Sequence, residues 1–138
     1  MKKILLGSML LALVSTSCKK DDAKCDRNMA NISGSYHLTS LKYKASSSSS
    51  EVDLYPLQDA CQKDDVITLS ANGVFTYTDA GVACSPNGTY SSTWSLSGNT
   101  VTIDGDASTI TSFDCKTLVI NKTDVGTGES STITIVKN

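Results

Sequence analysis

The side chains best suited to covalent or acid–base chemistry in this 138-residue chain are five cysteines and one histidine. His37 would have to serve as the base of a Ser-His-Asp arrangement, yet it lies out of phase with Tyr36 and Leu38, so we expect it to face solvent. Asp64 and Asp65 could pair for acid–base work, but acids before a strand are more often a solvated loop end or partners for a lysine. These residues do not predict an enzyme.

Metal chemistry finds no better support in the sequence. Asp104, Asp106 and Asp114 offer the oxygen ligands that calcium prefers, but their D-G-D spacing lacks the remaining ligands of a calcium loop and is typical of a turn. No CxxC motif is present and the chain has a single histidine, so zinc lacks a ligand set. We therefore expect neither a metal nor another cofactor.

Four of the cysteines are spread along the part of the chain that we expect to fold: Cys25, Cys61, Cys84 and Cys115. In an exported chain an even number suggests two disulfides. Four cysteines allow three pairings, and spacing alone does not choose among them. The pairing that we favour is Cys61–Cys84 with Cys25–Cys115. The shorter loop would stabilise the fold by roughly 3 kcal/mol and the longer one by about 4–5 kcal/mol.

Residues 1–17 have the composition of a secretory signal peptide. Lys2 and Lys3 precede an apolar run over residues 4–14. At about 1.5 Å per residue a helical run of this length covers only about half of a bilayer core of roughly 30 Å. The run is therefore too short for a spanning helix and is typical of a cleaved signal.

The fifth cysteine, Cys18, follows the small residues Ser15, Thr16 and Ser17. This ending resembles the lipobox of bacterial lipoproteins in the relaxed form found in Bacteroidetes, and the KKDD that follows resembles a surface-export signal of that group. The resemblance implies a lipidated Cys18 that anchors the protein to the bacterial outer membrane, with exposure at the cell surface. The alternative is ordinary cleavage that leaves a free thiol. Residues 18–31 are polar and are predicted to be a flexible tether.

The charge balance excludes one class of partner. The chain has a formal charge of −2, and removal of residues 1–17 takes away two lysines and leaves −4. No basic patch exists, so nucleic acid is not expected to bind. About a hundred residues remain after the tether, which is enough for one domain with a modest core, and we expect a monomer.

Strand signals dominate the chain after residue 31. Two β-rich runs flank Asn72-Gly73, two more flank Gly98-Asn99, and Asp104-Gly105-Asp106 marks a third turn, which together predict successive antiparallel hairpins. A phase change between Leu38 and Leu41 predicts a bulge near Thr39-Ser40. The predicted strands are residues 33–44, 66–70, 74–79, 92–97, 100–104, 107–113, 116–122 and 130–137.

Alternation places apolar and aromatic side chains on one face of these strands and Ser or Thr on the other. Seven or eight strands in an up-and-down meander can close into a small barrel or stop at a half-barrel. The aromatic residues of the inner face could line a ligand cavity, with tyrosine hydroxyls fixing a polar head, or fill the interior as plain core. These candidates are Tyr36, Phe75, Tyr77, Tyr90 and Trp94.

Residues 32–138 resemble a known family. The opening ISGSYHLTSL resembles the first strand of lipocalins, with Tyr36 in place of the usual Trp. The order of CQKDD, a glycine hairpin, a second cysteine and GTYSSTWSLSG is similar to the lipocalin-like domain of Bacteroidetes lipoproteins. The resemblance implies a small antiparallel barrel or half-barrel in residues 32–138 and a Cys61–Cys84 disulfide. It brings no shared ligand or chemistry.

The functional expectation is a lipid-anchored, non-enzymatic protein of the cell envelope. It would bind a small or partly apolar ligand, or an envelope protein, through the curved sheet with its aromatic inner face. The alternative is a structural or protein-interaction module of the outer membrane or cell surface with a fully packed barrel.

Overall fold

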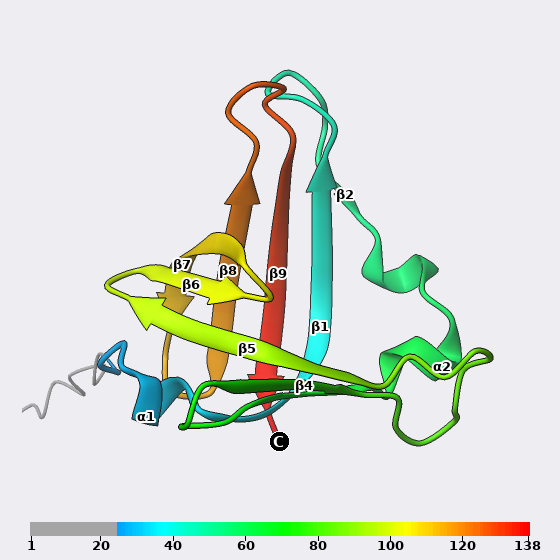
Figure 1. Cartoon of the computed structure of the whole chain (residues 1–138). Helices are drawn as coiled ribbons and strands as arrows, with labels where there is room; N and C mark the ends of the chain where they lie inside the picture. Colours follow the sequence, from blue (N-terminus) through cyan, green and yellow to red (C-terminus); the bar gives the residue numbers. More distant parts are fainter. Residues whose placement is uncertain (1–24) are drawn as a thin grey trace, which may run out of the picture.

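The computed structural model describes residues 25–138, which form an antiparallel β-structure with short helical segments (Figure 1). Each run predicted to be a strand forms one, and one short additional strand, β2, was not predicted. The strands are β1 (Gly34–Lys44), β2 (Val52–Asp53), β3 (Val66–Leu69), β4 (Val74–Thr78), β5 (Tyr90–Ser97), β6 (Thr100–Ile103), β7 (Asp106–Phe113), β8 (Thr117–Thr123) and β9 (Ser130–Lys137).

The sheet closes on itself. Strands pair antiparallel in the order β1-β3-β4-β5-β6-β7-β8-β9, and β9 pairs again with β1, so eight strands form a closed barrel while β2 is added beside the end of β1. The closing seam is long, because it runs from Tyr36 opposite Lys137 to Lys44 opposite Ser130. Figure 1 shows β1, β9 and β8 side by side, with β5 crossing them at a steep angle. The predicted all-β up-and-down architecture is confirmed, in its closed form rather than as a half-barrel.

A bulge in β1 keeps its apolar side chains inside the barrel. The register between β1 and β9 shifts between Leu38 and Ser40, as the phase change in the sequence predicted. Tyr36 and Leu38 face inward before the bulge, and Leu41 takes up the inward phase after it. The extra residue also bends the strand, which helps a small sheet to curl until its edges meet.

The core lies at one end of the barrel and receives side chains from nearly every strand. Val101, Ile110, Leu118 and Ile135 are inward positions of β6, β7, β8 and β9, and each is almost fully buried. Burial of an aliphatic side chain of this size contributes roughly 1.5–3 kcal/mol. The complete buried apolar set is Ile32, Tyr36, Leu69, Phe75, Trp94, Val101, Ile110, Phe113, Leu118, Ile120 and Ile135.

Residues 25–31 belong to the folded domain, and this corrects the tether predicted over residues 18–31. Asn28 caps the short helix α1 (Met29–Ile32) by accepting the Asn31 amide at 2.8 Å. Ile32 is fully buried, and its carbonyl accepts the hydroxyl of Tyr36. The helix therefore covers one end of the barrel, which we call the closed end.

Arg27 and a disulfide fasten this segment to the far side of the barrel. The guanidinium of Arg27 donates to Asn99 Oδ1 at 2.8 Å and to the carbonyl of Ile110 at 3.1 Å. Cys25 is bonded to Cys115 in the turn between β7 and β8, a sequence separation of 90 residues. The closed end is thus held by covalent and polar links as well as by burial.

The connection from β2 to β3 carries the second disulfide. It contains a 3₁₀ turn, η1 (Tyr55–Leu57), and one turn of helix, α2 (Ala60–Lys63). Cys61 in α2 is bonded to Cys84 in the loop after β4. Both favoured disulfides are therefore present in the structure.

The predicted signal peptide of residues 1–17 and the predicted lipidation site Cys18 lie outside the described residues. Among residues 25–138, no helix has the length and apolar character needed to cross a bilayer.

Candidate functional site

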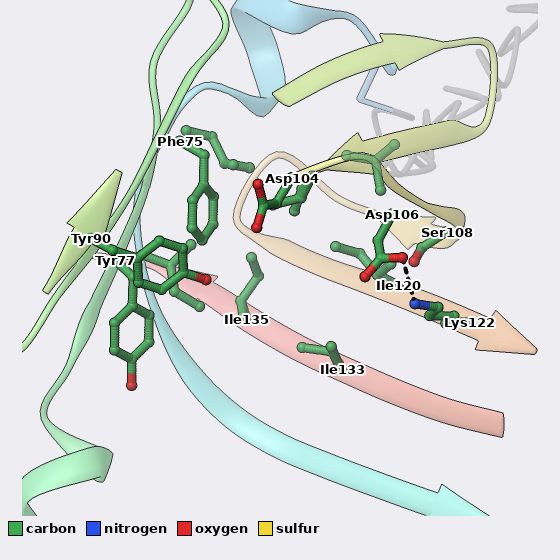
Figure 2. Close-up of a pocket in the computed structure, with 14 residues that line it drawn as sticks. Phe75, Tyr77, Tyr90, Asp104, Asp106, Ser108, Ile120, Lys122, Ile133 and Ile135 are labelled. Atoms are coloured by element: carbon green, nitrogen blue, oxygen red, sulfur yellow. Dashed lines mark ion pairs between the residues drawn. The ribbon is translucent and has the colours of Figure 1, made fainter. Parts of the chain in front are cut away.

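The barrel contains a cavity of about 360 Å³ (Figure 2). This volume lies at the lower end of the range for small-molecule sites in proteins, roughly 300–1,000 Å³. Its walls come from β3 through β9. The lining residues are Ile67, Leu69, Phe75, Tyr77, Tyr90, Val101, Ile103, Asp104, Asp106, Ser108, Ile120, Lys122, Ile133 and Ile135.

The cavity opens at the end of the barrel opposite α1. On β9 the lining residues are Ile133 and Ile135, whereas Lys137, further along the same face, donates to the carbonyl of Asn31 at the closed end. On β8 the lining residues are Ile120 and Lys122. They lie two and four residues after the buried Leu118, on the same face of the strand. The exposed lining residues, which we call the mouth, are Tyr90, Asp104, Asp106 and Lys122.

Aliphatic side chains make most of the wall. Ile67, Val101, Ile120 and Ile135 project inward from four different strands because each occupies an inward position of its strand. Such a wall offers no hydrogen bond to a ligand. It therefore suits an apolar body, whose transfer from water contributes roughly 25 cal/mol per Å² of buried apolar surface.

Polar groups gather on one side of the cavity, along β7, β8 and the β6–β7 turn. Lys122 Nζ lies 3.0 Å from Asp106 Oδ1, and these side chains are 50 % and 75 % exposed. Asp104 Oδ1 accepts the hydroxyl of Ser92 at 2.6 Å. Figure 2 shows Asp104, Asp106 and Lys122 along this side, across from the tyrosines.

The turn between β6 and β7 fixes where Asp104 lies. Asp104 and Gly105 both have positive φ, +52° and +82°. This combination is typical of the tight two-residue hairpin turns whose twist matches that of the strands. The turn begins directly after Ile103, the last residue of β6, which lines the cavity. Asp104, the next residue, therefore lies at the rim of the cavity.

Three aromatic rings form the opposite side. Tyr90 stacks on Tyr77 with ring centroids 5.8 Å apart, and its centroid lies 5.6 Å from that of Phe75. Tyr77 and Tyr90 are directly paired across β4 and β5, which explains the contact. Tyr90 remains 49 % exposed and Phe75 is buried, so the rings lead from solvent into the barrel.

A buried carboxylate supports this aromatic side. Asp65 is only 6 % exposed and accepts hydrogen bonds from the hydroxyl of Tyr77 and, at 3.2 Å, from the amide of Ala80. Burial raises the pKa of Tyr77 above its ordinary value, and the hydrogen bond to Asp65 adds to the rise. The expectation of a solvated loop end at Asp64-Asp65 is therefore wrong for Asp65.

Two of the five aromatic candidates lie outside the cavity. Tyr36 is fully buried under α1, and Trp94 is 3 % exposed and donates its indole N–H to the carbonyl of Ser70 at 2.8 Å. Neither lines the cavity. Phe75, Tyr77 and Tyr90 do, so the candidate set divides into core at the closed end and cavity wall towards the mouth.

The remaining candidate chemistry gathers no cluster in the described residues. His37 places Nδ1 3.0 Å from the carbonyl oxygen of Asp65, on the outer face of β1. Within residues 25–138, no group of three or more His, Cys, Asp or Glu side chains could hold a metal ion.

Sequence reasoning missed the polar residues of the cavity. Alternation did carry a signal for them, because Ser108 is in phase with Ile110 on β7 and Lys122 is in phase with Ile120 on β8. We interpreted Asp104 and Asp106 as turn residues without placing their side chains at the rim of the cavity; Asp104 is in the turn, whereas Asp106 is the first residue of β7.

Comparison with known proteins agrees with the architecture. A family model described as "Lipocalin-like domain" matches residues 32–136, from the end of α1 to nearly the end of β9. A search of curated proteins and a search of solved structures each found no significant match. Because the family match spans more than half of the chain and coincides with the closed barrel, the chain belongs to the family of lipocalin-like domains.

Proposed function

We propose that this protein is a non-enzymatic binding protein of the cell envelope that takes a small, partly apolar ligand into its barrel. The observation that carries the proposal is the cavity of about 360 Å³, with an aliphatic wall and an exposed polar mouth. The membership of a lipocalin-like family supports it. The alternative of a fully packed barrel that acts only as an interaction module does not account for this cavity.

The proposal includes a lipid anchor at Cys18. Its support is the signal-like segment of residues 1–17, the lipobox-like ending before Cys18, and the KKDD that follows. Several acyl chains on one residue would hold the protein durably, since each buried CH₂ contributes roughly 0.8 kcal/mol. The protein would then be a monomer on the bacterial outer membrane, exposed at the cell surface.

Ligand binding is tested with N-phenyl-1-naphthylamine, an uncharged dye whose fluorescence rises in apolar surroundings. We expect saturable binding by the wild-type protein. Ile133→Trp should abolish most of the signal because Ile133 lines the cavity and the larger ring fills it. The matched control is Val125→Trp, since Val125 is 97 % exposed in the turn between β8 and β9.

Equal dye binding by Ile133→Trp and wild type would refute the cavity as the site. The folded state of each variant is checked by its urea midpoint, because an overpacked core can lose about 1–3 kcal/mol. The anchor is tested separately by intact-mass analysis of protein purified from the envelope. We expect an acyl-modified Cys18 as the first residue, and an unmodified thiol there would refute lipidation.

A further inference from the structure

We infer that the cavity selects ligands that carry a single positive charge next to an apolar body, such as alkylammonium compounds. This inference rests on the proposed function, because it names the class of ligand for the same cavity. It is carried by the charges and rings at the mouth, where a polar head group would remain when the apolar body is inside.

The charges of the mouth do not balance. The lining contains two carboxylates, Asp104 and Asp106, and one ammonium group, Lys122. Lys122 is engaged by Asp106 at 3.0 Å. Over the residues that the structure describes, Asp104 forms no ion pair. One negative charge therefore remains for a ligand to neutralise.

Asp104 is held in position for this role. Its Oδ1 accepts the Ser92 hydroxyl at 2.6 Å, and the turn that carries it is fixed by positive φ at Asp104 and Gly105. A carboxylate that is already oriented loses less side-chain entropy when it binds a cation. Its second oxygen can approach an ammonium group without breaking the bond to Ser92.

The aromatic side of the mouth favours the same sign of charge. Tyr90 is half-exposed and stacks on Tyr77, so aromatic surface is available beside the opening. The face of an aromatic ring attracts cations, by about 0.5–1 kcal/mol at exposed sites and more when water is excluded. A cationic head between Asp104 and the rings would gain from both.

An anionic head would find no comparable partner. The only cation of the lining, Lys122, already faces Asp106. Lys137, on the same face of β9 as Ile133 and Ile135, lies at the closed end and donates to the carbonyl of Asn31. A carboxylate or sulfate at the mouth would therefore lie near Asp104 without compensation and be repelled.

The test compares three probes that share a decyl chain: decyltrimethylammonium, 1-decanol and decanoate. Each displaces N-phenyl-1-naphthylamine from the full-length mature protein at neutral pH and low salt, below its micelle-forming concentration. We expect the ammonium compound to bind about three- to tenfold more tightly than 1-decanol, and decanoate to bind more weakly than both. The preference should shrink as salt is added, because the mouth is exposed.

Two variants should change the preference in opposite directions. Asp104→Asn keeps the shape, tolerates positive φ and can still accept from Ser92, so it should remove most of the preference for the ammonium probe. Lys122→Met frees Asp106 and should increase that preference severalfold. The matched control is Glu51→Gln, an exposed acid paired with Lys42 on the outside of the barrel, which should leave the preference as in wild type.

The outcomes separate the two proposals. Binding of all three probes with equal affinity would overturn the charge selection while the cavity remains a binding site. Tighter binding of decanoate would overturn it as well, and would assign the selection to Lys122. Displacement of the dye by none of the probes would count against both the charge selection and the proposed function.

Discussion

The hydroxyl of Tyr77 donates a hydrogen bond to a carboxylate oxygen of Asp65, a side chain that is only 6 % exposed. This contact joins the start of β3 to the end of β4 at the aromatic side of the cavity. This one hydrogen bond gives the buried Asp65 carboxylate a donor and holds the ring of Tyr77 in place in the cavity wall. The stability of the barrel and the shape of its cavity are therefore linked at this pair.

Removal of either partner of this bond should destabilise the protein. Tyr77→Phe removes one of the hydrogen-bond donors to the Asp65 carboxylate. Asp65→Asn replaces one acceptor oxygen by an NH₂ group, which can only donate. Each substitution should lower the free energy of unfolding by about 1–3 kcal/mol. Urea unfolding of both single variants and the double variant measures the coupling, which we expect at about 0.5–3 kcal/mol. Additive losses would mean that the two side chains act independently.

High pH should destabilise the fold through two tyrosines. Burial raises the pKa of Tyr36 and of Tyr77 above the ordinary value. Above about pH 10 the unfolded chain therefore loses protons that the folded chain keeps, so the free energy of unfolding falls, by up to about 1.4 kcal/mol per pH unit for each tyrosine. Urea midpoints measured across this range should fall less steeply in Tyr36→Phe. An unchanged slope would contradict this origin.

Lys137 should act with the opposite sign. Burial lowers the pKa of Lys137, so as pH rises towards about 10.4 the folded chain loses this proton before the unfolded chain does. The unfolded state then binds more protons, and stability rises with pH in that window. Lys137→Met should remove this rise of the urea midpoint below about pH 10. The fall of the midpoint at higher pH, which we assign to Tyr36 and Tyr77, should persist in this variant. A rise that survives the substitution would assign it to another group.

The two disulfides should contribute unequally. Their sequence separations are 90 residues for Cys25–Cys115 and 23 for Cys61–Cys84. Replacement of both cysteines by alanine should cost about 4–5 kcal/mol for the first and roughly 3 kcal/mol for the second, on chain entropy alone. Urea unfolding measures the loss in free energy of unfolding for each of the two variants. Hydrogen exchange should increase over α1 only in the first variant, and equal protection of α1 in both would contradict its role as a clamp.

Alanine at Gly73 should cost more than alanine at Gly98. Both glycines have positive φ, +86° and +58°, where an L side chain costs roughly 1–2 kcal/mol. A Cβ at Gly73 would also lie 3.2 Å from the carbonyl oxygen of Trp94, whereas one at Gly98 meets nothing within 4 Å. Thermal unfolding of the two variants tests the order, and an equal loss would show that the contact with Trp94 relaxes freely.

Local patterns predicted the strands well because alternation and turn residues act over a few positions. The phase change between Leu38 and Leu41 located the bulge, and Gly98 marked its hairpin. Closure was left open between barrel and half-barrel. It depends on the pairing of β1 with β9, which lie about a hundred residues apart, and no local pattern carries that information.

The errors share one physical cause, which is burial of polar sequence by distant partners. Residues 25–31 read as a tether, yet Cys25 and Arg27 find their partners on β7 and the turns beside it. Asp65 read as solvated, yet Tyr77 and the loop after β4 enclose it. The polar composition of such segments indicates exposure to solvent. Their contacts with distant residues are visible only in the tertiary structure.

The disulfide between Cys25 and Cys115 also determines at which end of the barrel the described chain begins. It places Cys25, the first described residue, at the end covered by α1, which is the end away from the opening of the cavity. Six residues lie between Cys18 and Cys25, so the two Cα atoms are seven steps apart along the chain and at most about 25 Å from one another. With the proposed acyl group on Cys18, the base of the barrel would rest near the lipid and its opening would look outward, so that cargo would arrive from the surrounding water rather than from the bilayer.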